Sequence, residues 1–256
     1  METKTPREAA TLALSLLDLT NLREDCDEQA IETLCGRAST PYGSVAAICI
    51  WPRFVAQARA LLREGNKIRI ATVVNFPSGG LPVEAVVEET RRAISDGADE
   101  IDLVIPYRAF LAGDESAVVE MTAAVRQACS KACLKVIIET GELKESARIR
   151  RASELAIAAG ADFIKTSTGK VRVNATLEAA DVMLRTILQS GRTIGFKPAG
   201  GISTVADADL YLRLAGTIMG DDWIMPSTFR FGASSLLDDI VAVLSGQASQ
   251  RTSTGY

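Results

Sequence analysis

The sequence contains no histidine in 256 residues. This absence excludes the Ser-His-Asp and Cys-His arrangements of hydrolases, because both use an imidazole as their base. It also disfavours zinc catalysis and metal-dependent aldolases, because imidazole is a principal zinc ligand. The five cysteines form no C-x-x-C pair, and they are Cys26, Cys35, Cys49, Cys129 and Cys133. We therefore expect free thiols, as in a reducing cytoplasm, and no metal site.

Aromatic residues are scarce as well, at 5% of a chain that is 47% hydrophobic. The core must therefore be aliphatic, which is typical of a parallel sheet buried on both faces. The net charge of −4 comes without a basic block, and this disfavours nucleic acid as a partner. Neither a signal peptide nor an apolar run of membrane length is present, so we expect a cytoplasmic protein without a membrane partner.

From Tyr42 onward the sequence alternates between short apolar strands and longer helices. The expected strands are Val45–Ile50, Ile68–Asn75, Glu100–Ile105, Leu134–Thr140, Phe163–Thr168, Thr193–Lys197, a poorly marked one near Thr217–Ile224, and Thr228–Ala233. The expected helices are Pro52–Glu64, Val83–Asp96, Ala117–Ser130, Glu145–Ala159, Leu177–Ser190, Ala206–Ala215 and Ser235–Leu244. This alternation predicts an α/β fold, a (β/α)₈ TIM barrel.

We expect the barrel to be one domain spanning residues 1–256. Residues 1–40 are predicted to form two extra N-terminal helices that close one end of the barrel, Glu8–Leu17 and a second helix that Asp27 caps and that ends near Arg37. Residues 246–256 are predicted to form a flexible polar tail.

Two successive strands end in a lysine, Lys165 and Lys197. Burying an unpaired ammonium group is costly, although a lysine at a strand end can also extend its stem to solvent. Two such lysines at the carboxyl ends of barrel strands favour a functional pair, because that end carries the active site. Two ammonium groups about 6 Å apart lower each other's pKa by roughly two units. A lysine made neutral in this way can attack a carbonyl, but the residues alone do not show which one does so.

Acidic residues and a third lysine lie in the neighbouring strands. Asp102 interrupts an otherwise apolar strand and needs a cationic partner. Either it pairs structurally with Lys135 or an arginine, or it faces Lys165 or Lys197 and relays protons. Lys135 and Glu139 are predicted to share one face of their strand, where Lys135 forms a supporting ion pair or takes an active role.

A phosphate site is predicted in the late loops, which commonly bind phosphate in this fold. Glycine-rich turns and a helix N-terminus expose backbone N–H groups, and a nearby lysine adds positive charge. Turn geometry alone could also explain the glycines. The candidates are Thr168, Lys170, Gly200, Gly201, Gly232, Ser234 and Ser235.

Six motifs carry a resemblance to a known family over about Leu14–Ser235. They are AAICIWPRF, EIDLVIPY, KVIIETGELK, FIKTSTGK, GFKPAGG and RFGASS, and the last residue of the chain is also a matching tyrosine. In this order they resemble the deoxyribose-phosphate aldolases, which are class I aldolases. The resemblance implies reversible cleavage of 2-deoxy-D-ribose 5-phosphate to acetaldehyde and D-glyceraldehyde 3-phosphate, without a metal or cofactor.

The resemblance also implies roles for individual residues. Lys165 would form the Schiff base, Lys197 would depress its pKa, and Asp102 would move protons. Tyr256 would assist proton transfer at the methyl carbon of the imine, and Asp18 and Thr20 of the D-L-T motif would bind substrate. The alternatives are another Schiff-base barrel, of the transaldolase or keto-acid aldolase type, and a non-catalytic barrel that binds a sugar phosphate. The oligomeric state, including a homodimer, is open.

Overall fold

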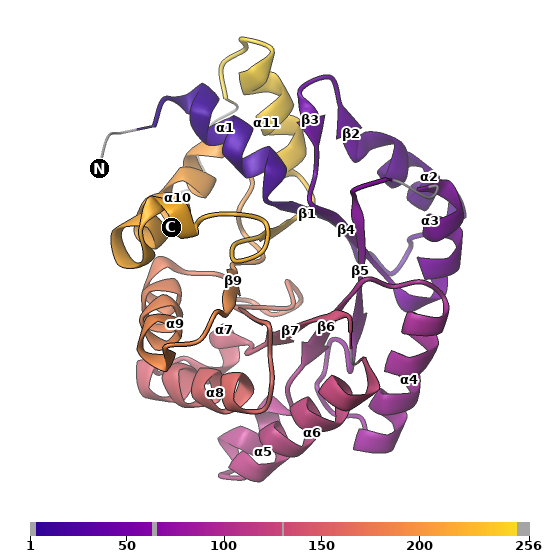
Figure 1. Ribbon diagram of the computed structural model, residues 1–256, viewed down its shortest axis with the longest axis vertical. Coiled ribbons are helices and arrows are strands. Elements are labelled where there is room, and N and C mark those ends of the chain that lie inside the picture. The colour runs from indigo at the N-terminus through magenta and orange to yellow at the C-terminus, as the bar shows by residue number, and fades with distance from the viewer. Residues whose placement is uncertain (1–3, 63–65, 130, 250–256) are drawn as a thin grey trace.

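The protein forms a barrel of eight parallel strands surrounded by helices, in a computed structural model that describes residues 4–62, 66–129 and 131–249 (Figure 1). The barrel strands are β1 (Leu17–Asn21), β4 (Ala47–Ile50), β5 (Arg69–Val74), β6 (Glu100–Val104), β7 (Cys133–Ile137), β8 (Phe163–Lys165), β9 (Gly195–Lys197) and β10 (Phe231–Ala233). They are ordered β10-β1-β4-β5-β6-β7-β8-β9, and bridges between Phe196 and Phe229 and between Ala199 and Gly232 close the circle. The predicted TIM barrel is confirmed.

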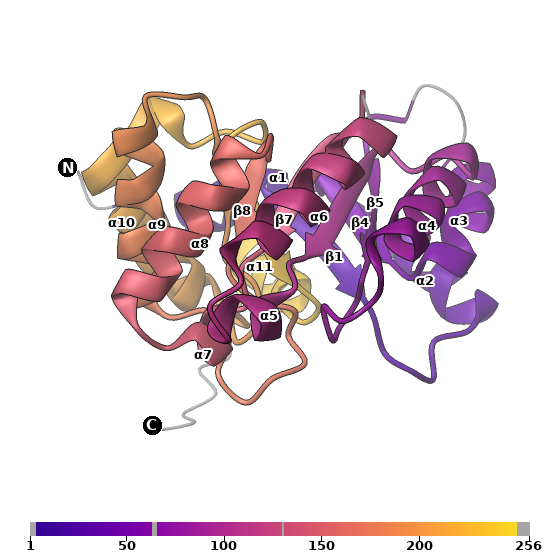
Figure 2. The ribbon, with the colours of Figure 1, turned by 90° about the horizontal axis from the view of Figure 1, so that it is seen from below.

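Helices follow the strands around the outside of the barrel. They are α1 (Pro6–Ser15), α2 (Glu28–Arg37), α3 (Val55–Leu61), α4 (Val83–Ser95), α5 (Tyr107–Leu111), α6 (Glu115–Ala128), α7 (Thr140–Leu143), α8 (Ser146–Ala158), α9 (Leu177–Ser190), α10 (Val205–Met219) and α11 (Leu236–Leu244). A hairpin of β2 (Ser39–Thr40) and β3 (Gly43–Ser44) precedes β4. The short helices α5 and α7 follow β6 and β7, and they mark the face of the barrel that carries the strand carboxyl ends (Figure 2, lower edge).

Local sequence signals explain where several helices begin and end. The hydroxyl of Thr176 accepts the N–H of Ala179 at the start of α9, and Gly191 ends that helix with a φ of 63°. Helix α10 begins with a capping box between Thr204 and Asp207. The predicted bounds of α9 are therefore correct at both ends.

The prediction for residues 1–40 is wrong in one respect. Leu17–Asn21 is not a connection between two helices but the first barrel strand, and it pairs with β10 and β4. Helix α2 is consequently a barrel helix, and α1 alone precedes the barrel strands in the described residues. The strand was overlooked because of Asp18: a carboxylate inside a short apolar run argues against burial unless cationic side chains pair with it.

The predicted strand near Thr217–Ile224 is also wrong. Helix α10 continues through Met219, and a 3₁₀ turn follows at Asp221–Trp223. Ile218 and Met219 are partly buried against the core, so their apolar character reflects the last turn of the helix. The prediction reached eight strands only because this extra strand replaced the overlooked β1.

Candidate active site

The two strand-end lysines lie side by side inside the barrel. Lys165 and Lys197 are paired positions on β8 and β9, and their side chains are almost fully buried. Both ammonium groups donate to the same atom, Oδ2 of Asp102, at 2.8 Å each. The two Nζ atoms are thus no more than 5.6 Å apart, because each lies 2.8 Å from one oxygen. Asp102 faces these lysines as expected.

Lys135 occupies the position on β7 that pairs with Asp102 on β6. Its Nζ donates to Oδ1 of Asp102 at 3.0 Å and to Oε2 of Glu100 at 2.5 Å. Asp102 therefore binds three lysines, and both its structural and its functional partners named from the sequence are present. Lys135 makes the expected ion pair.

Asp18 enters the same group from β1 and is fully buried. One of its oxygens accepts from Lys197 at 2.5 Å, and the other accepts from Arg230 at 2.7 Å. Arg230 also donates to Glu100 at 3.0 Å. These contacts close a ring of alternating charge, which we call the charge ring: Asp102, Lys197, Asp18, Arg230, Glu100 and Lys135.

The charge ring has three formal positive and three formal negative charges, so its formal charge is zero. Lys165 is attached to it through Asp102 alone among the ion pairs of the described residues. When Lys165 is protonated, the group as a whole carries one unbalanced buried positive charge. Such a charge is unfavourable in a low-dielectric interior.

Electrostatics within the ring oppose the effect of burial. Burial disfavours the charged form of Lys197, but the carboxylates of Asp102 and Asp18 raise its pKa to about 12. Against the same cost of burial, the neighbouring carboxylates hold the pKa of Lys135 well above its usual value. Burial would likewise raise the pKa of Asp102 and Asp18, but the surrounding cations hold both well below the usual range. These four groups are therefore charged at neutral pH.

Glu139 is separate from the charge ring, contrary to the expectation that it shares a strand face with Lys135. Strand β7 ends at Ile137, and Glu139 has a left-handed backbone with a φ of 57°. Its Oε1 accepts the N–H of Thr168 at 3.2 Å. Its Oε2, Thr140 Oγ1 and Ser167 Oγ are buried without a hydrogen-bond partner among the described residues. Burial raises the pKa of Glu139.

The glycines proposed for phosphate divide into two groups. The N–H of Gly232 donates to the carbonyl of Pro198 at 2.9 Å, and the N–H of Gly200 donates to the carbonyl of Gly232 at 3.3 Å. The sequence led us to expect free amides here, but these two N–H groups close the barrel and are not free for an anion. Gly201 is exposed in the same turn, with a φ of 82°.

The remaining candidates lie near the carboxyl ends of the strands. Ser234 and Ser235 are exposed and directly precede α11, and Ser235 makes no side-chain cap. Lys170 donates through Nζ to the carbonyl of Leu22 at 2.8 Å. The hydroxyl of Thr168 accepts the N–H of Lys170, and that of Thr20 donates to the carbonyl of Asp18. Tyr256 lies outside the described residues.

Sequence reasoning missed Arg230 and Glu100. The signal was present, because Arg230 stands between Phe229 and Phe231 just as Lys165 follows apolar neighbours. Glu100 is two positions before Asp102, so both side chains face the same side of β6. Lysines inside apolar strands were interpreted as site residues, but the same pattern was overlooked for Arg230 and Glu100.

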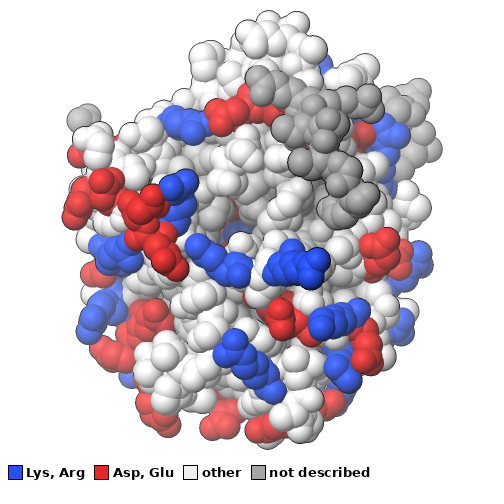
Figure 3. Space-filling view, turned by 180° about the vertical axis from the view of Figure 1, so that it is seen from behind, with Lys and Arg blue, Asp and Glu red and all other residues white. Residues whose placement is uncertain are grey.

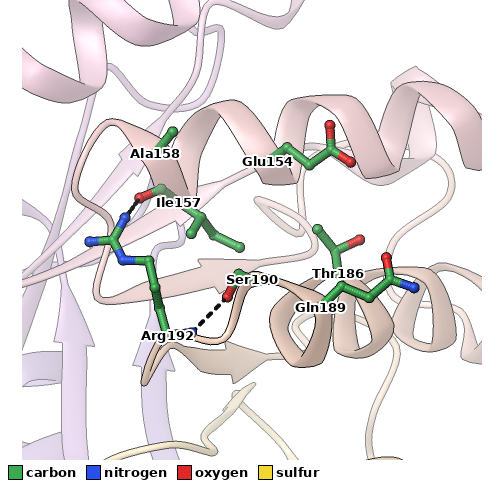
Figure 4. Close-up of a pocket in the computed structure, with 7 residues that line it drawn as sticks. All are labelled: Glu154, Ile157, Ala158, Thr186, Gln189, Ser190 and Arg192. Atoms are coloured by element: carbon green, nitrogen blue, oxygen red, sulfur yellow. Dashed lines mark hydrogen bonds between the residues drawn. The ribbon is translucent and has the colours of Figure 1, made fainter.

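The remainder of the surface gives less information on chemistry. A pocket of about 320 Å³ lies between the carboxyl ends of α8 and α9, where Arg192 donates to the carbonyl of Ile157 (Figure 4). None of its lining residues belongs to the charge ring. Acidic and basic side chains are interspersed on the face seen in Figure 3. Within the described ranges, every helix is too short or too polar to cross a membrane.

Comparison with known proteins agrees with this geometry. Residues 12–240 match the sequence model of the DeoC/LacD family aldolases. The chain belongs to this family. A deoxyribose-phosphate aldolase from Agrobacterium fabrum is 70% identical over 257 aligned positions, which cover 100% of this chain and 99% of the relative. The family resemblance seen in the motifs is therefore confirmed.

Solved structures support the fold of this aldolase. A crystal structure from Toxoplasma gondii ME49 superposes with a TM-score of 0.87 at 24% identity, and the alignment covers 95% of this chain and 96% of the other. A second structure, from Coccidioides immitis, has a TM-score of 0.83 at 29% identity, with 92% and 87% covered. At 24% identity, the comparison with the Toxoplasma gondii structure shows the barrel fold alone.

Proposed function

We propose that this protein is a deoxyribose-phosphate aldolase that reversibly cleaves 2-deoxy-D-ribose 5-phosphate to acetaldehyde and D-glyceraldehyde 3-phosphate through a Schiff base on Lys165. The proposed activity and substrate are supported by the name of the relative that is 70% identical over the whole chain, a deoxyribose-phosphate aldolase. The observation that carries the mechanism is the single ion pair of Lys165 to an otherwise neutral charge ring.

The same observation distinguishes Lys165 from the other two lysines. Lys197 contacts two carboxylates, and Lys135 lies within 3.6 Å of three. Removing a proton from either would weaken its contacts with two or three buried carboxylates at once. Removing one from Lys165 instead affects its pairing with Asp102 alone among the ion pairs of the described residues. Lys197, whose pKa is raised to about 12, stays positive beside it.

The reaction then follows from the chemistry of an imine. The Lys165 amine adds to the C1 aldehyde of the open-chain sugar, and loss of water gives the imine. Loss of the proton from the C3 hydroxyl breaks the C2–C3 bond, and the electron pair moves into the protonated imine to form an enamine. Protonation of the enamine carbon and hydrolysis release acetaldehyde. Asp102, which accepts from Lys165 at 2.8 Å, would move protons through water.

For the phosphate we propose the N-terminus of α11 with Ser234 and Ser235, together with Gly201 and Lys170. A helix N-terminus favours an anion through its free N–H groups and dipole. Thr168, Gly200 and Gly232 would shape this end of the site, and Asp18 and Thr20 would act on the sugar side. The role of Tyr256, the cytoplasmic location and the homodimer remain predictions.

A retro-aldol assay in EDTA tests this proposal. The purified protein should release glyceraldehyde 3-phosphate from 2-deoxy-D-ribose 5-phosphate, with much lower kcat/KM for unphosphorylated 2-deoxy-D-ribose. Lys165→Met should be inactive, and Lys67→Met, at an exposed lysine, should retain activity. Lack of turnover of the phosphorylated sugar, or equal turnover of transaldolase or keto-acid substrates, would contradict the proposal.

A further inference from the structure

We propose that Arg230 and Glu100 are positioning residues that set, through the charge ring, the pH range in which Lys165 acts as a nucleophile. The inference rests on the proposed function and adds two residues to it. Neither residue makes an ion pair with Lys165 in the described part of the chain. Both act through Asp18, Lys197, Lys135 and Asp102.

Arg230 is held rigidly inside the barrel. It is only 6% exposed. Its guanidinium donates from Nη1 to Asp18 at 2.7 Å, from Nη2 and Nη1 to Glu100 at 3.0 and 3.3 Å, and from Nε to the carbonyl of Pro226 at 2.5 Å. The rings of Phe229 and Phe231 pack edge-on with centroids 4.9 Å apart. The guanidinium therefore has a fixed place between two carboxylates.

Glu100 completes the opposite side of the ring. It is 4% exposed, lies at the start of β6, and accepts from Lys135 at 2.5 Å and from Arg230 at 3.0 Å. Glu100 and Arg230 can influence the Lys165 amine without contacting the aldehyde. In a low-dielectric interior, each charge acts on the lysine amine over several bond lengths.

The formal charge of the ring decides the sign of each effect. Removing the charge of Arg230 leaves the ring at −1, which matches a protonated Lys165, so the amine becomes free only at higher pH. Removing the charge of Glu100 leaves the ring at +1, which disfavours a protonated Lys165, so the amine becomes free at lower pH. One unit charge roughly 10 Å from the amine, at an effective dielectric near 20, is worth about one pH unit.

The other groups around Lys165 are common to every variant and do not change these signs. Besides Arg230 and Glu100, the titratable groups around it are Asp18 from β1, Cys49 from β4, Asp102 from β6, Lys135 from β7, Glu139 from the turn after β7, and Lys197 from β9. Burial raises the pKa of the Cys49 thiol, which keeps it neutral. Strand β5 contributes Ala71 and Val73, which do not titrate.

The test is the pH dependence of kcat/KM for retro-aldol cleavage in five variants. The midpoint of its acid limb should rise by about one unit in Arg230→Met and fall by about one unit in Glu100→Gln. In Arg230→Met/Glu100→Gln it should return toward that of the unsubstituted enzyme. Arg230→Lys should have a midpoint close to that of the unsubstituted enzyme, because lysine keeps the positive charge. Glu115→Gln, which removes a charge from a surface ion pair with Arg151, should leave the midpoint unchanged.

Opposite shifts distinguish tuning from a structural role, which would lower activity without moving the midpoint. Unchanged midpoints, or shifts in the same direction, would overturn the inference. If Arg230→Met does not fold, as judged by circular dichroism, the nearly isosteric Glu100→Gln decides alone: no downward shift refutes the inference. An unsubstituted protein that does not cleave deoxyribose 5-phosphate refutes the proposed function instead.

Discussion

Gly232 leaves the space that the side chain of Lys197 occupies. A Cβ atom on Gly232 would lie 3.1 Å from Cε of Lys197 and 2.8 Å from Cβ of Ala199. Both separations are shorter than carbon atoms tolerate without movement. Gly232 therefore serves the reacting lysine pair, as well as closing the barrel through its backbone.

We predict that Gly232→Ala lowers kcat by about 10–100-fold, because a displacement of Lys197 by a fraction of an ångström weakens its contacts with Asp18 and Asp102. The matched control is Gly36→Ala on α2, where an added Cβ would meet no atom within 4 Å. That change should leave kcat unaltered and stabilise the fold by about 0.5–1 kcal/mol. Steady-state kinetics and urea unfolding measure both. Equal kcat values for the two variants would remove Gly232 from this role.

Lys197→Leu should lower kcat at pH 7 by about 10²–10³-fold, because it deletes the positive charge that favours a neutral Lys165. We expect the variant to fold, since Asp18 keeps Arg230 and Asp102 keeps Lys135 as a cationic partner. Near-UV circular dichroism checks the fold. Near-normal turnover by a folded variant would show that Lys197 does not tune the nucleophile.

Glu139→Gln should make the protein less sensitive to pH: relative to the parent, its free energy of unfolding should be higher at pH 8 than at pH 4. Burial raises the pKa of Glu139, so the folded protein binds this proton more tightly than the unfolded chain does. The contribution of this group to stability is therefore lost as the pH rises from the usual carboxyl value through the raised pKa. Glutamine keeps an oxygen for the N–H of Thr168 and carries no charge. Urea unfolding at the two pH values gives the difference, and a variant as pH-dependent as the parent would refute the assignment.

The barrel could be predicted because its pattern is local. Runs such as Ile68–Asn75 and the capped helix Leu177–Ser190 carry their own strand and helix signals. The first strand could not be recognised, because Asp18 is tolerated in it only through Lys197 and Arg230, which come about two hundred residues later. The end of α10 was misread because an apolar last turn resembles a short strand.

The lysines and Asp102 of the candidate site could be predicted from the sequence, whereas Arg230, Glu100 and the full set of contacts could not. The sequence predicted that Lys165 and Lys197 lie at one end of the barrel and that Asp102 faces them. It did not show which of the lysines around Asp102 is the nucleophile. That ranking depends on which carboxylates each lysine contacts, and on Arg230 and Glu100, which fix the formal charge of the ring. These are three-dimensional facts, because the contacts join β1, β6, β7, β9 and the residue that precedes β10.

The most direct test of the account is to trap the imine. Reduction with borohydride in the presence of acetaldehyde should add one two-carbon unit, and peptide mass spectrometry should locate it on Lys165. Lys165 is the lysine of the three that pairs with a single carboxylate in the described residues, so it should carry the label alone. A label on Lys197 or Lys135 would contradict the assignment of roles, and no label at all would contradict the Schiff-base mechanism.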